Sequence, residues 1–165
     1  MNEQLNKLVR VNCGGQCWGL GLVQYSNIVQ VTETEHLMEI CKKAHEVFPD
    51  TISPDIYYQY LRIGIFELRI IALVTFNDGV MTSCAVLCFG KDLINQPTIT
   101  TDFMWIDPHY PTLFKEYLKY VEKIVNEKGI KRIIIPTCRN EKAFERKYGK
   151  YGFMKTYTVF EKKVS

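Results

Sequence analysis

The sequence has no long hydrophobic run and little net charge. No apolar stretch reaches the roughly 18 residues that a membrane span needs, and the start of the chain lacks the apolar core of a secretory signal. The formal net charge is only +3, so charge gives no reason to expect nucleic acid or a membrane surface as a partner. The densest basic cluster, residues 142–150, is broken by Glu145, which favours a solvated face over a nucleic-acid footprint.

The sequence also lacks the cysteine patterns of a metal site or a disulfide scaffold. Its 6 cysteines in 165 residues are sparser than those of small secreted scaffolds, so we expect free thiols in a reducing compartment. Cys13 and Cys17 have no second Cys or His pair at ligand spacing nearby, which predicts no metal site. Cys84 and Cys88 are expected to point to one face of a strand as small apolar residues.

The remaining composition is that of one globular domain. Hydrophobic residues make up 47% and charged residues 24% of the chain, which is enough to bury a sizeable core. The first 27 residues differ, because CGGQCWGLG places four glycines among apolar residues and disfavours a regular element. We predict an N-terminal arm at residues 1–27, packed on its own domain or on another chain, and a domain at residues 28–165.

From residue 28 onward, hydrophobic periodicity predicts regular elements. The first helix should bury one stripe, formed by Leu37, Ile40, Cys41, Ala44, Val47 and Phe48. Pro54 should open a second helix ending near Gly64, and Asn77-Asp78-Gly79 predicts a hairpin turn. Further strands are predicted at residues 28–33, 98–106, 130–137 (buried) and 153–164, and further helices at 111–128 and 140–148. This order predicts a mixed α/β sheet with helices on both faces.

Three stretches within this order resemble the GNAT (N-acetyltransferase) superfamily. FMWIDPHY resembles the end of the family's fourth strand, and KEYLKYVEKIVNEKGIKRIIIPT resembles its central crossover. NEKAFERKYGKYGF is similar to the family's signature, which is the most specific of the three. The matching residues in that stretch are Asn140, Ala143, Tyr148, Gly152 and Phe153. The resemblance spans residues 28–164, and it is similar in type to compact, divergent GNAT-like proteins of phages.

The resemblance implies a site for acetyl-CoA between the fourth and fifth strands, which splay apart in the family. The pantetheine arm would pair with backbone groups of Met104, Trp105 and Ile106, much as an added strand does. The pyrophosphate would lie at the start of the next helix, near Tyr110, Thr112 and Lys115. Asn140 would hydrogen-bond the pantetheine arm, although a helix N-cap explains this residue equally well.

The same resemblance implies catalytic roles for two residues. Tyr148 would protonate the departing thiolate, or else pack between the last helix and the sheet. Asp102 would be the general base for the amine. Alternation places it on one face with Thr100, Met104 and Ile106, where burial would raise its pKa; the alternative is an exposed strand end. His109 also suits proton transfer, but the sequence identifies no partner for it.

The loop after Pro108 departs from the family pattern and leaves two functions open. HYPTLFKEYL contains no glycine and no arginine, and Pro111 removes one N–H donor where the family has a basic residue. One reading is an N-acyltransferase that transfers acetyl from acetyl-CoA to an unidentified small-molecule or protein amine held between the first helices and the sheet. The other is a catalytically inactive structural or assembly protein, such as a phage virion component, whose arm contacts other chains. The expected location is the cytoplasm, or the virion in the second case.

Overall fold

The sheet is mixed and has five strands in the part of the chain that is described. The computed structural model describes residues 28–31, 34–49, 53–92, 94–136 and 141–155, in two compact units within residues 1–135 and 136–165. The first unit contains β1 (Val29–Gln30), α1 (Thr34–Val47), α2 (Pro54–Phe66), β2 (Ile70–Asn77), β3 (Val80–Lys91), β4 (Pro97–Ile106), α3 (Leu113–Glu127) and β5 (Arg132–Ile134). The strand order is β1-β2-β3-β4-β5, with β1 to β4 antiparallel and β5 parallel to β4. The predicted mixed α/β architecture is confirmed.

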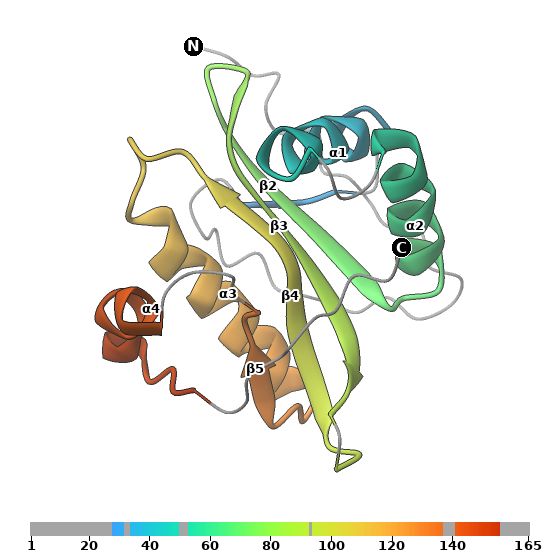
Figure 1. The fold of residues 1–165 in the computed structure, drawn as a ribbon. Coiled ribbons are helices and arrows are strands. Elements are labelled where there is room, and N and C mark those ends of the chain that lie inside the picture. Colours follow the sequence, from blue (N-terminus) through green and yellow to red (C-terminus); the bar gives the residue numbers. More distant parts are fainter. Residues whose placement is uncertain (1–27, 32–33, 50–52, 93, 137–140, 156–165) are drawn as a thin grey trace, which may run out of the picture. The chain divides into compact units, whose positions relative to one another are not determined.

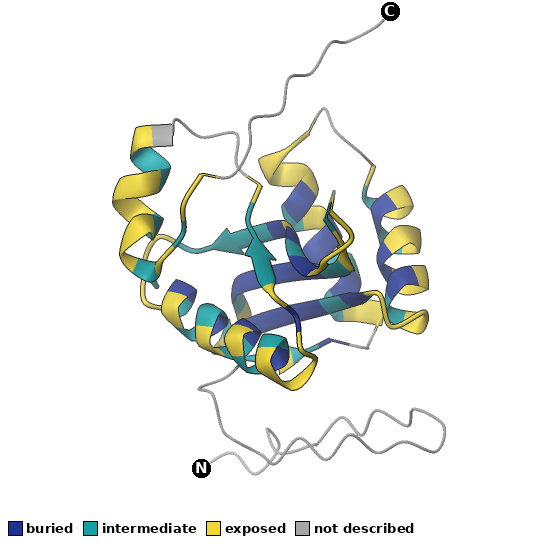
Figure 2. Cartoon of the chain, turned by 90° about the horizontal axis from the view of Figure 1, so that it is seen from below, coloured by how far each residue is buried: buried dark blue, intermediate teal, exposed yellow. Residues whose placement is uncertain are grey.

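Two hydrophobic layers cover the two faces of this sheet. Helices α1 and α2 pack on one face and α3 packs on the other (Figure 1). Adjacent residues of β3 alternate between them, because Cys84 and Val86 belong to the α1/α2 layer whereas Ala85 and Leu87 belong to the α3 layer. Buried positions concentrate on the strands and on the helix faces turned toward them (Figure 2). Burial on both sides explains why the central strands are nearly continuous hydrophobic runs.

The first two helices follow the sequence closely, with differences at their ends. In α1 the stripe of Leu37, Ile40, Cys41 and Ala44 is buried as predicted. Val47 and Phe48 are 43% and 44% exposed, which contradicts the prediction. Helix α1 ends at Val47, so the chain turns away from the hydrophobic layer of α1 and α2 at this point. Phe48 still makes an edge contact with Phe103, with 6.2 Å between the ring centroids.

Helix α2 begins where the sequence predicts and ends later. The Ser53 hydroxyl accepts a hydrogen bond from the Ile56 amide (3.3 Å), and Pro54 occupies the first turn, as is typical of a helix start. The helix continues to Phe66, two residues past the predicted end at Gly64. Gly64 packs so closely on Ile70 that a Cβ atom would lie 2.3 Å from Ile70 Cδ1. Gly64 therefore serves close packing on β2 and does not end the helix.

The turn between β2 and β3 lies where the sequence predicts it, whereas α3 and β5 differ from their predicted bounds. Asp78 and Gly79 have positive φ angles of 50° and 78°, so the Asn77-Asp78-Gly79 turn predicted between β2 and β3 is confirmed. Helix α3 starts two residues later than predicted, and Gly129 follows it with φ 63°. Strand β5 has three residues and is only half-buried, whereas the sequence predicted a longer buried strand.

The second unit contains α4 (Glu141–Tyr148) and a 3-10 turn (Gly149–Tyr151). Gly152 adopts φ 83°, a left-handed conformation that glycine adopts without steric cost. The predicted helix at residues 140–148 is confirmed over its described residues. Residues 153–155 form no strand, and the rest of the strand predicted at 153–164 lies outside the described residues, as do Asn140 and the predicted arm at residues 1–27.

Candidate active site

Strands β4 and β5 pair over only a short length. Their register runs from Thr98↔Arg132 to Thr100↔Ile134, whereas β4 continues to Ile106. Beyond Thr100, none of the described residues pairs with the β4 edge that faces away from β3. Pairing that ends partway along β4 is required by the divergence of the fourth and fifth strands that the resemblance implies.

The open edge of β4 presents backbone groups at alternate residues. The Asp107 amide donates to the Thr82 carbonyl of the β3 chain at 2.9 Å. Because backbone groups of an antiparallel strand alternate in direction, the amide and carbonyl of Met104 and Ile106 point away from β3. The backbone groups of Trp105 face β3 instead. Two of the three residues that the sequence proposed for pantetheine pairing therefore direct their backbone toward the open edge.

The wedge between β4, β5 and α3 is largely filled. Thr101, Met104, Phe114 and five other apolar or aromatic residues line a cavity of about 10 Å³ there, which is room for at most one water molecule. Phe103 and Trp105 pack with the α1/α2 layer on the other face, so these two large side chains do not enter the wedge. A ligand of pantetheine size would therefore lie along the β4 edge and not inside this cavity.

A carboxylate fixes the start of β5. The Arg132 guanidinium bonds Asp92, which also accepts hydrogen bonds from the amides of Gln96 (2.8 Å) and Ile94 (3.0 Å). The Gln96 amide first, and then the Arg132 and Ile94 bonds, hold the pKa of Asp92 below its usual value. This arrangement connects the start of β5 to the turn between β3 and β4.

We expect the Asp92 contacts to make stability depend on pH in the acid range. A depressed carboxyl pKa stabilises the fold above the unfolded pKa of about 4, and this contribution is lost as pH falls through the folded value. Between about pH 5 and pH 2, the urea midpoint of the wild type should fall more steeply than that of Asp92→Asn. Glu122→Gln, at an exposed position of α3, is the control and should follow the wild type. If the urea midpoints of Asp92→Asn and the wild type fall equally with pH, the depressed pKa of Asp92 does not contribute to stability.

A β-bulge sets the position of Asp102. Leu87 pairs with Thr101 and Val86 pairs with Phe103, so Asp102 is an extra residue without a partner on β3. The bulge puts Asp102 and Phe103 both on the α1/α2 face, where the Tyr57 hydroxyl donates to Asp102 Oδ2 at 2.8 Å. Met104 packs in the α3 layer, which contradicts the prediction that it shares a face with Asp102. The Asp102 side chain is exposed, so the burial expected for it is absent.

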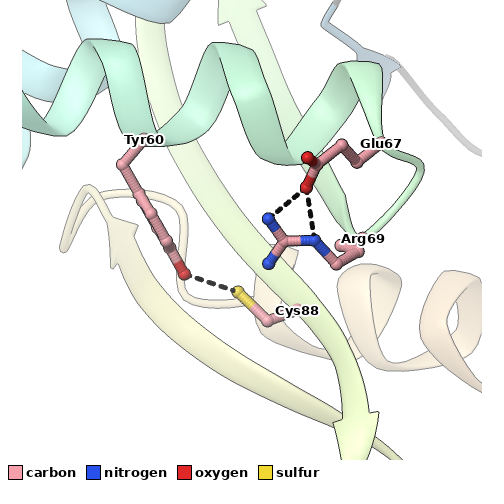
Figure 3. Close-up of polar contacts among 4 residues, drawn as sticks. All are labelled: Tyr60, Glu67, Arg69 and Cys88. Atoms are coloured by element: carbon pink, nitrogen blue, oxygen red, sulfur yellow. Dashed lines mark hydrogen bonds and ion pairs between the residues drawn. The ribbon is translucent and has the colours of Figure 1, made fainter.

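Two stacked tyrosines of α2, Tyr57 and Tyr60, lie beside Asp102, and we call this pair the tyrosine wall. The rings of Tyr57 and Tyr60 stack with centroids 5.8 Å apart and planes at 16°, and Tyr60 Oη lies 3.4 Å from Cys88 Sγ (Figure 3). Burial first, and then the charge of Asp102, raises the pKa of Tyr57, so its hydroxyl remains a neutral donor. Burial likewise raises the pKa of Cys88, which keeps the thiol protonated.

Sequence reasoning missed this cluster, because it assigned no functional role to Tyr57 or Tyr60. The available signal was the spacing of two tyrosines three residues apart on a helix, which places their rings side by side.

The loop between β4 and α3 is held by its own hydrogen bonds. The His109 amide and His109 Nδ1 each lie 2.8 Å from Asp107 Oδ1, so His109 has a partner that the sequence did not identify. The amide bond first, and then the side-chain bond of His109, lowers the pKa of Asp107. The Tyr110 hydroxyl accepts a hydrogen bond from Asn77 Nδ2 in the hairpin turn (2.9 Å). His109 thus fixes the loop internally, and Tyr110 connects it to the β2–β3 hairpin.

The start of α3 offers few amides to an anion. Pro111 has no N–H, the Leu113 amide donates to the Tyr110 carbonyl (3.1 Å), and the Lys115 amide donates to the Thr112 carbonyl (3.0 Å). The Thr112 side chain makes no cap bond. Such bonds must break or be shared before a pyrophosphate can use these groups. Pro111 and these internal bonds therefore leave fewer free donors here than an ordinary helix start has.

The described part of α4 contains Tyr148. Its ring lies 4.6 Å from the Phe144 ring, and Lys147 Nζ lies 5.2 Å from its centroid. The side chain is half-buried. The proton-donor role of Tyr148 stays a prediction.

No group of His, Cys, Asp and Glu in the described segments could hold a metal ion. None of the helices in the same segments is long and apolar enough to cross a membrane.

Comparisons by sequence find no match to a family model or to a curated protein. Comparison by structure matches acetyltransferases. An aminoglycoside 6'-N-acetyltransferase from Acinetobacter baumannii is 16% identical with a TM-score of 0.67, over 84% of this chain and 99% of that one. The chain has the fold of the GNAT acetyltransferases.

Two further structures with the GNAT fold agree. AAC(6')-Iy, in complex with the bisubstrate analogue CoA-S-monomethyl-acetylneamine, is 16% identical with a TM-score of 0.67, over 84% of this chain and 97% of that one. An acetyltransferase of Trypanosoma brucei is 16% identical with a TM-score of 0.64, over 84% and 99% of the two chains. Identities this low establish the GNAT fold and leave the acceptor open.

Proposed function

We propose that the chain is an acetyl-CoA-dependent N-acetyltransferase whose acceptor is a small-molecule amine. One observation carries the proposal: the open edge of β4 lies in the same strand segment as the exposed carboxylate of Asp102. An edge of this kind binds an extended ligand through backbone hydrogen bonds, and the adjacent carboxylate can accept a proton. The structural neighbours, which are named as acetyltransferases, support the same chemistry.

In this proposal the acetyl-CoA site follows the β4 edge toward α3. The outward groups of Met104 and Ile106 pair with the amides of the pantetheine arm. The pyrophosphate lies near Tyr110, Thr112 and Lys115. Each missing charge-assisted hydrogen bond costs about 1.5–3 kcal/mol. Because the Leu113 and Lys115 amides already have partners, we expect acetyl-CoA affinity in the micromolar range or weaker.

The reaction is a direct acyl transfer from sulfur to nitrogen. The amine nitrogen attacks the thioester carbonyl, the N–C bond forms, and the C–S bond breaks with its electron pair left on sulfur. The proton released by nitrogen passes to Asp102, directly or through water, and the thiolate takes a proton from a general acid, for which Tyr148 is the candidate from the sequence. Exchange with solvent restores the protonation state of both groups, so the products are an amide and the free thiol of CoA.

Calorimetry tests the proposal at its first step. Titration of the full chain with acetyl-CoA should give a saturable heat at micromolar to millimolar ligand. Disruption of residues 110–116 should weaken it, because the loop supplies the pyrophosphate contacts. A titration that gives no heat at millimolar acetyl-CoA would remove the proposed function.

A further inference from the structure

One flank of α2 is exposed and apolar. Ile56, Tyr60 and Ile63 are 61%, 40% and 51% exposed. Their spacing of four and three residues places them on one side of the helix. We call these three residues the α2 flank. Grouped exposure of large apolar side chains is uncommon on a soluble protein surface and marks a binding surface.

The α2 flank connects to Asp102 through the tyrosine wall. The ring of Tyr60 stacks on Tyr57, whose hydroxyl donates to Asp102 Oδ2 at 2.8 Å. Figure 3 shows Tyr60 extending from α2 to Cys88 of β3, where the contact at 3.4 Å fixes its ring. The apolar α2 flank therefore leads, through Tyr60 and Tyr57, to the exposed carboxylate of Asp102.

The charges near this wall are few. Glu67, just after α2, accepts a hydrogen bond from Arg69 Nε at 2.7 Å and is neutralised by that guanidinium (Figure 3). Lys43 lies over the Trp105 ring at 4.5 Å and adds a cation on the same face. Asp55, in the first turn of α2, is a further exposed carboxylate, but Asp102 is the one that accepts a hydrogen bond from the tyrosines. Asp102 can therefore receive one ammonium group at the end of the α2 flank, while Lys43 and Arg69 oppose further ammonium groups nearby.

Resting on the proposed function, we infer that the acceptor is a monoamine with an apolar or aromatic body. Its amine group lies at Asp102 and its body lies along the α2 flank, where apolar burial and attraction of the ammonium to the tyrosine faces favour it. A polycationic sugar amine would bring further ammonium groups next to Lys43, Arg69 and apolar side chains. Tyr60 is then a specificity-determining residue.

Three amines test this assignment with the full chain and acetyl-CoA: 2-phenylethylamine, ethylamine and kanamycin. We expect kcat/KM from CoA thiol release to be at least about tenfold higher for 2-phenylethylamine than for the other two, the scale of burying one ring. Tyr60→Ala should lower the ratio of the values for 2-phenylethylamine and ethylamine about tenfold. Tyr60→Phe keeps the ring and should preserve the preference.

Two further variants separate specificity from folding. Ile63→Ala shortens the α2 flank without touching the Tyr60–Cys88 contact and should reduce the same preference. Ile94→Ala, at a 72% exposed residue between β3 and β4, should change nothing. A preference for kanamycin, or equal slowing of all amines by Tyr60→Ala, would overturn the inference.

Failure of the proposed function would look different. In that case acetyl-CoA gives no heat and no amine releases thiol. Ligand-observed NMR with 2-phenylethylamine and ethylamine, without acetyl-CoA, then decides the inference alone. Selective binding of 2-phenylethylamine that is lost in Tyr60→Ala supports it, and equal or absent binding of the two amines rejects it.

Discussion

Replacing Asp102 by asparagine is expected to lower kcat/KM for acetyl transfer by about 100-fold or more, the scale of one general base. Asparagine keeps the size of the side chain and can still accept the Tyr57 hydrogen bond through its amide oxygen. It cannot take the proton that the attacking nitrogen must lose. Acetyl-CoA binding should therefore be unchanged in calorimetry, while CoA thiol release in the presence of an accepted amine falls.

The matched control for Asp102→Asn is Asp55→Asn, which removes an exposed carboxylate from the first turn of α2. This variant should retain wild-type kcat/KM. Both proteins should melt within a few degrees of the wild type, because both positions are exposed and surface changes are small in energy. An Asp102→Asn protein with full activity would remove Asp102 from the reaction and leave the acetyl-CoA site untouched.

Features of the fold that are set by neighbouring residues could be predicted from the sequence. Leu37 and Ile40 follow the helical period, and Asp78 and Gly79 tolerate the positive φ of a tight turn, so α1 and the hairpin were predicted where they occur. The open length of β4 was implied by the resemblance alone. The sequence of β5 did not show that its pairing ends at Ile134, because the end of a pairing depends on both strands.

The candidate site could be predicted only in part, since its decisive contacts are non-local. The sequence predicted Asp102 to be a base, which stays a prediction, and the environment predicted for it was wrong because a bulge is a property of the register between two strands. The Tyr57–Asp102 hydrogen bond joins residues 45 positions apart, and no periodicity within α2 indicates it. The bulge also explains why Asp102 is exposed beside tyrosines while Met104, two residues later, packs under α3.

The two halves of the proposed site differ in how well they are built. Around Asp102, buried Tyr57 and the Tyr60–Cys88 contact fix the side chains before any ligand binds. At the start of α3, the Leu113 and Lys115 amides are used within the loop itself. Cofactor affinity should therefore depend more on the β4 edge than on the pyrophosphate loop. A substitution at the β4 edge therefore tests where the affinity for acetyl-CoA comes from more directly than a substitution in the loop.

Met104→Pro is expected to raise the dissociation constant for acetyl-CoA about tenfold or more, because it removes one hydrogen bond and adds a ring at the ligand's edge. The Met104 amide points away from β3, so proline at this position deletes an outward donor and breaks no bond of the β3–β4 ladder. Met104→Leu keeps the N–H and the apolar packing under α3, and is the matched control. Calorimetry on the two folded variants should separate them clearly. If Met104→Pro and Met104→Leu bind acetyl-CoA equally well, the pantetheine arm does not pair with β4 at this residue, and the open edge loses its proposed role.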